Sequence, residues 1–209
     1  NIPQSKYLDF KGHTEYLANR FNSSTMMIMT ADKTRVALAS DHIPLSEISE
    51  TVNVSYLNKK IDEFNLALKF DFDISNPKIA ILGLNPHAGD GGKIGLEEKN
   101  TIIPCIQLKR KEGIIAHGPF PSDSFFGKKL YLQFDGVLAI YHDQGLIPFK
   151  MLYFEKGVNN TCGLPFIRTS PDHGVAFDIA GQNLADETSF RESIFHAIKR
   201  TKARQEYTA

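Results

Sequence analysis

The sequence lacks several features that would place it in a common class of protein. Its 24 basic and 24 acidic side chains leave no net charge, which argues against a dominant surface for nucleic acid or for an anionic membrane. No apolar run approaches the roughly 20 residues of a membrane-spanning helix, and nothing resembles a signal peptide. The chain also begins without methionine, so we expect a fragment or a processed product.

Cysteine and short catalytic signatures are equally scarce. The two cysteines, Cys105 and Cys162, form no CxxC pair and lie among apolar residues. We therefore predict two reduced, buried thiols in a cytoplasmic protein. The sequence has no HExxH metal motif, no Walker A motif and no GxGxxG fingerprint. The glycine-rich stretch at residues 89–95 is then either a tight turn or a place where backbone approaches a ligand.

The apolar pattern predicts an α/β fold. With 209 residues, 42% of them hydrophobic, the chain can form one large domain or two small lobes. Runs at 25–29 and 35–39 predict an antiparallel hairpin, and continuous apolar runs at 78–84 and 134–141 predict strands covered on both faces. Because helical segments alternate with these strands, we expect a mainly parallel sheet.

Helical periodicity is clearest after Pro44. Apolar residues recur there at three- to five-residue steps and predict one buried helix face: Ile48, Val52, Leu57, Ile61, Phe64 and Leu68. A second helix is expected from Glu97 to about Arg110, and a mixture of short strands and turns from 145 to 168. A capping box from Ser189 to Glu192 predicts the start of a terminal helix. The acidic, Phe-rich residues 62–73 look like an insertion without a functional interpretation.

Three histidines follow three of the predicted strands. His42 comes after the run ending at Ala39, His87 after the run ending at Leu84, and His142 directly after Tyr141. In open α/β sheets ligands bind beyond the carboxyl ends of strands, so these imidazoles can converge on one divalent metal ion. Structural histidines are the alternative. Asp143, beside His142, is either a partner of that imidazole or a solvated turn residue.

Other polar residues are candidates for binding an anionic substrate. Lys150, Asn159 and Arg168 stand in an otherwise apolar region, and Arg suits a bidentate grip on carboxylate or phosphate. His13 and Thr14 share this interpretation, although Thr14 is also a possible helix cap. Residues 170–181 contain a histidine, two aspartates and two glycines, which is typical of a binding loop.

Taken together, these segments resemble the 4-hydroxythreonine-4-phosphate dehydrogenase family of the vitamin B6 pathway. The matching runs are GHTE at 12–15, DHIPL at 41–45, LNPHAGDGG at 84–92, GPFPSD at 118–123, YHDQG at 141–145, GLPFIRTS at 163–170 and DHG at 172–174. They cover nearly the whole chain in the family's order. The resemblance implies a two-lobed α/β/α fold similar to that of isocitrate and isopropylmalate dehydrogenases.

The resemblance also implies the roles of particular residues. It assigns one divalent ion (Zn, Co or Mg) to His42, His87 and His142, and substrate contacts to His13, Thr14, Lys150, Asn159 and Arg168. It implies a homodimer whose sites take residues from both subunits, with His142 serving the partner's metal. Residues 1–145 would form a metal-binding and dimerisation lobe. Residues 146–209 would complete a cofactor-side lobe whose N-terminal part, roughly the family's first third, is absent.

Residues 173–181, HGVAFDIAG, are similar to the adenosine-binding loop of isocitrate and isopropylmalate dehydrogenases. By that match His173, Gly174 and Asp178 bind the cofactor, and Asp178 near the ribose favours NAD over NADP.

The implied reaction is a metal-assisted, NAD-dependent oxidative decarboxylation of 4-phosphohydroxy-L-threonine. Asp123, Asp143 and a hydroxide on the metal are all candidates for the base. Three alternatives stay open. The substrate can be a related sugar-acid phosphate, threonate or erythronate 4-phosphate. The histidines also suit a zinc hydrolase. Finally, the chain can be a non-catalytic fragment that binds metal and dimerises. No nucleic acid or membrane partner is expected.

Overall fold

The computed structural model describes residues 13–172 and 177–208. Its α-helices are α1 (His13–Arg20), α2 (Ile48–Thr51), α3 (Val54–Phe70), α4 (Ile103–Lys111), α5 (Ser122–Gly127), α6 (His142–Tyr153) and α7 (Thr188–Thr208). Its strands are β1 (Met26–Ala31), β2 (Thr34–Leu38), β3 (Lys78–Leu82), β4 (Ile115–Phe120), β5 (Gly136–Ala139), β6 (Val158–Cys162) and β7 (Arg168–Pro171).

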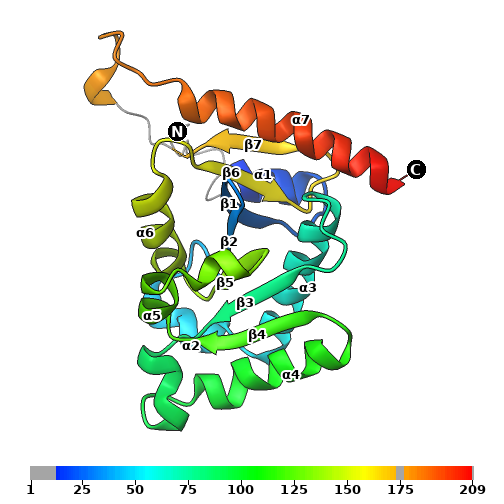
Figure 1. Cartoon of the computed structure of the whole chain (residues 1–209), viewed down its shortest axis with the longest axis vertical. Helices are drawn as coiled ribbons and strands as arrows, with labels where there is room; N and C mark the ends of the chain where they lie inside the picture. The colour runs from blue at the N-terminus through cyan, green and yellow to red at the C-terminus, as the bar shows by residue number, and fades with distance from the viewer. Residues whose placement is uncertain (1–12, 173–176, 209) are drawn as a thin grey trace.

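The described strands form one mixed sheet in the order β4-β3-β5-β2-β1-β6-β7. β4, β3, β5 and β2 are parallel neighbours, and β1 pairs antiparallel with both β2 and β6. β7 is antiparallel to β6, so only β1 and β7 of this sheet run against the other strands. Figure 1 shows α4 beside β4 at one edge and α7 beside β7 at the other. The predicted α/β class, the mainly parallel sheet and the N-terminal hairpin are confirmed.

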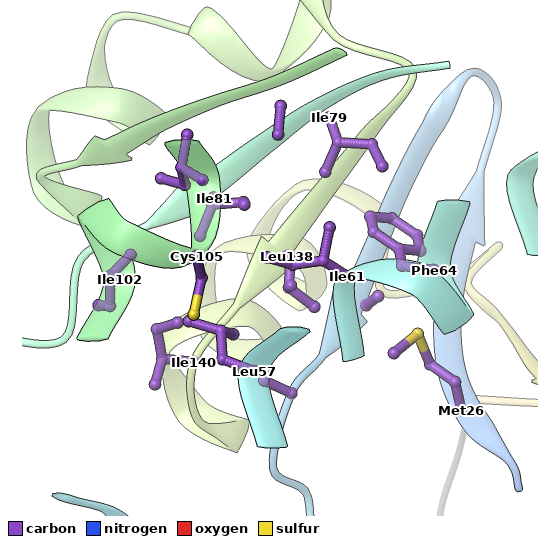
Figure 2. Close-up of a cluster of buried hydrophobic side chains, with 14 of the residues drawn as sticks. Met26, Leu57, Ile61, Phe64, Ile79, Ile81, Ile102, Cys105, Leu138 and Ile140 are labelled. Carbon is purple, nitrogen blue, oxygen red and sulfur yellow. The ribbon is translucent and has the colours of Figure 1, made fainter. Parts of the chain in front are cut away.

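Helices cover both faces of the sheet because the strand residues alternate between two cores. On β2, Ala37 faces a cluster built from α2, α3 and α4, whereas Val36 and Leu38 face a cluster that includes Phe125 of α5 and Phe149 of α6. Figure 2 shows the first cluster, where side chains from α3 meet those of the central strands. Strands covered on both faces account for the continuous apolar runs of the sequence.

The helical pattern after Pro44 is divided between two helices. α2 ends at Thr51, and α3 begins after Asn53, whose side chain accepts a hydrogen bond from the Tyr56 N–H at 3.0 Å. A cap of this kind starts a new helix. All six apolar residues of the pattern are nevertheless buried, at most 4% exposed. The period therefore identified the buried face correctly, although it did not reveal the break.

The prediction of short strands and turns from residue 145 was wrong for the first part of that region, which continues as α6. Gly145 and Pro148 lie inside this helix. A Cβ at Gly145 would stand 2.9 Å from side-chain atoms of Val36, Leu38 and Ala139, so glycine lets α6 pack closely on the sheet. The expected lobe boundary at 145–146 falls within α6, and β6 from the second segment pairs with β1 from the first. The division into lobes stays a prediction.

The predicted capping box of the terminal helix was also wrong. Ser189 lies inside α7, and its hydroxyl donates to the carbonyl oxygen of Gly157 at 2.8 Å. Asp186 accepts from the Thr188 N–H at 2.7 Å and takes the capping role. Because the Ser189 hydroxyl also accepts from the Asp172 N–H, it ties α7 to the end of β7.

Residues 62–73, interpreted as an insertion, belong to the core. They include the last part of α3, and Phe64 and Leu68 are fully buried there. Asp71 follows the helix and forms buried ion pairs with Arg200 at 2.9 Å and Arg204 at 2.6 Å of α7. The segment therefore joins α3 to α7.

The expectation of two buried thiols is confirmed. Cys105 and Cys162 are free and buried, and burial raises the pKa of Cys105 to about 11 and that of Cys162 to about 12. Both thiols are therefore protonated and unreactive near neutral pH. Within residues 13–172 and 177–208, no helix has the length and apolar character needed to cross a membrane.

Candidate functional site

The three predicted metal ligands follow three adjacent parallel strands. β5 lies between β3 and β2 and is parallel to both, with Leu138 opposite Ile81 and Ala139 opposite Leu38. His87 follows β3, His142 follows β5 and His42 follows β2. Since parallel strands end at one edge of a sheet, all three loops leave the same edge, where α/β proteins bind ligands.

Two of these histidines share a cavity. His42 and His142 both line a hollow of about 310 Å³, together with Asp41 and Asp143. The His142 Nδ1 is 2.7 Å from an oxygen of Asp143, and the His42 Nδ1 is 3.4 Å from Asp41. The His142 side chain is 44% exposed and that of His42 is 65% exposed, so both are accessible to a ligand.

His87 lies in a left-handed turn at the same edge. The five residues from His87 to Gly91 all have positive φ, between 42° and 78°. Such a conformation costs about 1–3 kcal/mol for each non-glycine residue and persists only where neighbours enforce it. Glu98 is one such neighbour. It is 3% exposed, and a Cβ on Gly89 would stand 2.6 Å from its Oε2.

A second group of candidates lies beside β6 and β7. The Arg168 guanidinium donates to the Thr161 hydroxyl at 2.5 Å and to the Thr14 hydroxyl at 3.4 Å. Burial lowers the pKa of Arg168 from its ordinary value, although the group stays charged at neutral pH. The structure thus brings together two predicted substrate-binding residues, Thr14 and Arg168.

Lys150 and Asn159 belong to the same region. Lys150, in the last turn of α6, forms an ion pair with Asp172 at 3.0 Å. Asn159 faces Ser170 across β6 and β7, and its Nδ2 is 3.3 Å from the Met27 sulfur. The Asn159 Oδ1 and the Asp172 Oδ2 are buried acceptors without a hydrogen-bond partner in the described structure. A ligand that donates hydrogen bonds suits them.

The structure describes only some of the remaining predicted site residues. Asp123 is exposed in the first turn of α5, which follows β4. Within the described ranges, no three His, Cys, Asp or Glu side chains cluster closely enough to hold a metal ion, so His87 does not join His42 and His142. His173 and Gly174 lie outside the described residues, as do the side chains of His13 and Asp178.

Sequence reasoning missed the buried side chains that support the histidine loops. Tyr56 of α3 donates to the carbonyl oxygen of Ala39 at 2.6 Å, just before His42. Burial raises the pKa of Tyr56 to about 12, so the phenol stays protonated and able to donate. Glu98 and Gln144 act similarly on the other loops. Because most of these partners are backbone groups 13 to 61 residues away, no local pattern reveals them.

The fold and the histidine-lined edge define an α/β protein of the class whose ligands bind beyond the carboxyl ends of parallel strands. The family model described as pyridoxal phosphate biosynthetic protein PdxA matches residues 1–197. The chain belongs to this family, which confirms the resemblance found in the sequence motifs.

Individual relatives agree with this assignment. A 4-hydroxythreonine-4-phosphate dehydrogenase of Bacteroides thetaiotaomicron is 50% identical over 97% of the chain and 56% of its own length. One of Sulfurihydrogenibium sp. is 46% identical over 94% of the chain and 61% of its own length. The chain therefore spans little more than half of these relatives.

Solved structures show the same fold. The 4-hydroxythreonine-4-phosphate dehydrogenase of Klebsiella pneumoniae matches with a TM-score of 0.79 and 38% identity, over 90% of this chain and 59% of that one. A terephthalate 1,2-cis-dihydrodiol dehydrogenase of Burkholderia xenovorans matches with a TM-score of 0.71 and 25% identity, over 90% of this chain and 60% of that one.

Proposed function

We propose that this chain contains the metal-binding and substrate-binding residues of an NAD-dependent, decarboxylating 4-hydroxythreonine-4-phosphate dehydrogenase. The substrate would be 4-phosphohydroxy-L-threonine and the product 3-amino-2-oxopropyl phosphate, in pyridoxine 5'-phosphate biosynthesis. The observation that carries the proposal is the delivery of His42, His87 and His142 to one sheet edge by three adjacent parallel strands. Relatives that carry the name of this enzyme support the choice of substrate.

The donor chemistry at this edge fits a divalent ion such as Zn, Co or Mg. Imidazole nitrogens are ligands for zinc and cobalt, and the cavity shared by His42 and His142 also contains the carboxylates of Asp41 and Asp143. His42 and His87 would supply two imidazoles to one ion, and the third would come from His142 of the partner subunit. A bound ion would act there as a Lewis acid that lowers the pKa of a coordinated hydroxyl. In a homodimer His142 would coordinate the metal ion of the partner subunit. A metal content that is lost when the dimer dissociates would identify this arrangement.

The cluster at β6 and β7 would hold the rest of the substrate. Arg168 and Lys150 would bind its carboxylate and phosphate, and the hydroxyl of Thr14 would orient one of these anions. The ammonium group of the substrate suits the unpartnered oxygens of Asn159 and Asp172. Together with His13, these residues would position the substrate, so that the carbon bearing the hydroxyl faces the histidine edge.

The reaction would remove a hydride from that carbon and transfer it to NAD, while Asp123 or Asp143 accepts the hydroxyl proton. The product of this step is a β-keto acid, whose carboxylate leaves as carbon dioxide. The remaining electron pair forms an enolate, which is then protonated. Nearby cations such as Lys150 stabilise the negative charge that develops. His173, Gly174 and Asp178 would hold the adenosine part of NAD, in a cytoplasmic homodimer.

The test is an assay of NADH production with 4-phosphohydroxythreonine, run with and without a chelator. We expect turnover that the chelator abolishes and that added Zn²⁺ or Co²⁺ restores. Threonate and erythronate 4-phosphates serve as comparison substrates, and a higher kcat/KM for either would reassign the substrate. Failure to bind NAD would favour the hydrolase alternative.

A further inference from the structure

Arg168 carries a positive charge that no carboxylate of the described chain neutralises. The guanidinium is half-buried, and it forms no ion pair with an acidic side chain of residues 13–172 or 177–208. Lys150 of the same cluster, in contrast, pairs with Asp172 at 3.0 Å. Because burial of an unpaired charge is costly, the Arg168 guanidinium suits an anion that comes from a ligand.

Thr161 stands directly opposite Arg168 in the antiparallel pair of β6 and β7. Its hydroxyl accepts a hydrogen bond from the Arg168 Nη1 at 2.5 Å, and the Thr14 hydroxyl accepts from the same nitrogen at 3.4 Å. Nη1 carries two N–H groups, so these two acceptors account for both. Thr161 is 1% exposed, and water therefore does not compete for its hydroxyl.

The opposite edge of the guanidinium is available to a ligand. Nε and Nη2 of Arg168 form no hydrogen bond with the part of the chain that the structure describes. One N–H of each nitrogen points away from this edge in parallel, which is the fork that grips two oxygens of a carboxylate or a phosphate. By engaging Nη1, Thr161 fixes which edge of the guanidinium a ligand meets.

A threonine hydroxyl is suited to this task because it is neutral. A carboxylate would also hold the guanidinium, but it would neutralise the charge, as Asp71 does for Arg200. A hydroxyl fixes the direction of Arg168 and leaves its charge for the ligand. The acceptor is itself held in place, since a β-branched side chain in a strand has few rotamers.

We propose that Thr161 is a positioning residue of the substrate site, whose hydroxyl presents the Nε–Nη2 edge of Arg168 to an anionic group of the substrate. The proposal rests on the substrate-binding role of Arg168 in the proposed function. It assigns Thr161 no contact with the substrate. Asn159 lies two residues earlier on the same face of β6, so this strand would supply both a substrate contact and the support of another.

The experiment measures the dissociation constant of 4-phosphohydroxy-L-threonine for the full chain by isothermal titration, in a buffer that contains Co²⁺. Thr161→Val keeps the shape of the side chain and removes the hydroxyl. We expect binding to weaken about 10- to 100-fold, the range for loss of a hydrogen bond to a charged group. Thr161→Ser keeps the hydroxyl and should bind like the wild type.

The matched control is Thr169→Val. Thr169 follows Arg168 on β7, but its hydroxyl donates to the Ser193 carbonyl oxygen of α7 at 2.8 Å, on the other face of the sheet. This variant should keep the wild-type affinity even if it lowers Tm as much as Thr161→Val does. An equal loss of affinity in the two valine variants would overturn the proposal.

A double-mutant cycle separates positioning from a general structural effect. Arg168→Lys keeps a positive charge but lacks the fork that Thr161 orients. In this background Thr161→Val should weaken binding no more than about twofold, because the two residues act as one unit. The full loss in both backgrounds would show that the hydroxyl acts independently of Arg168, and would overturn the proposal.

The remaining outcomes distinguish this proposal from the proposed function. Unchanged affinity in Thr161→Val, with wild-type binding that Arg168→Lys weakens, would overturn the positioning role and leave the substrate site intact. A wild-type chain that does not bind the substrate, or binds it independently of Arg168, would overturn the substrate site and with it the role of Thr161. If Thr161→Val does not fold, Thr161→Ala replaces it. Weaker binding in Thr161→Ala than in Thr161→Ser then supports the proposal, and equal binding overturns it.

Discussion

The buried carboxylate of Glu98 accepts hydrogen bonds from both the backbone N–H and the side-chain amide of Asn85, at 2.7 and 2.9 Å. Asn85 stands two residues before His87, the first residue of the left-handed turn. Glu98 thus holds the start of this strained turn, and the same carboxylate leaves no space for a side chain at Gly89.

Glu98→Ala should destabilise the protein and release the turn. The change leaves the half-buried Asn85 N–H without its acceptor, which costs about 1–3 kcal/mol. Urea unfolding measures the loss. The control is Glu97→Ala, because Glu97 also accepts from the Asn85 side chain, at 2.8 Å, but is more exposed. Water can replace that bond, so an equal loss in the two variants would contradict the prediction.

Asp71→Asn should be among the most destabilising conservative changes in the chain. Burial acts to raise the pKa of Asp71, but Arg200 and Arg204 together outweigh it, and the pKa lies below its ordinary value. Removing one partner of a buried ion pair costs about 3–5 kcal/mol, measurable by urea unfolding at pH 7. The exposed Asp73, which follows closely, provides the control Asp73→Asn, expected to stay within about 0.5 kcal/mol.

The same carboxylate sets a pH dependence. Because the folded pKa of Asp71 is depressed, its contribution to stability is complete above the unfolded value, about 3.9, and is lost as pH falls through the folded value. Wild-type stability should therefore decline in acid, and Asp71→Asn should decline less steeply. If the free energy of unfolding falls equally steeply with decreasing pH in the wild type and in Asp71→Asn, this prediction is wrong.

The free energy of unfolding should fall as the pH is lowered from 7 to 5, because His196 is held in its neutral form in the fold. Burial, with smaller effects of Arg200, Lys199 and Arg35, lowers the pKa of His196 despite the opposing charge of Glu192. The neutral ring, 3.2 Å from the Thr30 hydroxyl, is therefore favoured in the fold. The unfolded histidine takes up its proton near pH 6.5, so the stabilisation present above that pH is lost below it. Urea unfolding of His196→Gln should show a flatter slope in this window, and an unchanged slope would refute the assignment.

Gly145→Ala should strain the contact between α6 and the sheet. The new Cβ would lie 2.9 Å from three core side chains, and overpacking of this kind costs about 1–3 kcal/mol. Gly127→Ala is the matched control, since nothing lies within 4 Å of a Cβ there and its φ is not positive. Thermal unfolding should show a lower Tm only for the first variant. An equal Tm in the two variants would mean that α6 can shift away from the sheet without loss of stability.

His87→Ala should abolish metal binding and turnover with little effect on folding. The side chain is exposed, and its replacement leaves the bonds of Asn85 and Glu98 in place. Isothermal titration with Zn²⁺ and the NADH assay measure the two losses. His117→Ala, on β4 and away from the shared cavity, is the control and should bind the metal normally. Full activity of His87→Ala would remove this residue from the metal site.

Local sequence information determined several elements and their buried faces, but not all of the helices. The alternation of apolar residues was sufficient for the hairpin and for the core face of α3, because burial of those side chains follows directly from their spacing. It was insufficient for α6, where Gly145 and Pro148 normally indicate a break. Contact with β2 and β5 outweighs this local preference, and a contact between distant segments leaves no local signal.

The sequence by itself determined the family, the α/β class and the three histidines that follow strands. Only the tertiary structure decided that those strands are adjacent and parallel, which places the histidine loops at one edge. It also decided which residues support the loops, because Gln144, Glu98 and Tyr56 bond to backbone groups 4 to 61 residues away. Strand order and these hydrogen bonds depend on contacts between segments that are distant in the sequence. Periodicity reports only on residues that are close together in the sequence.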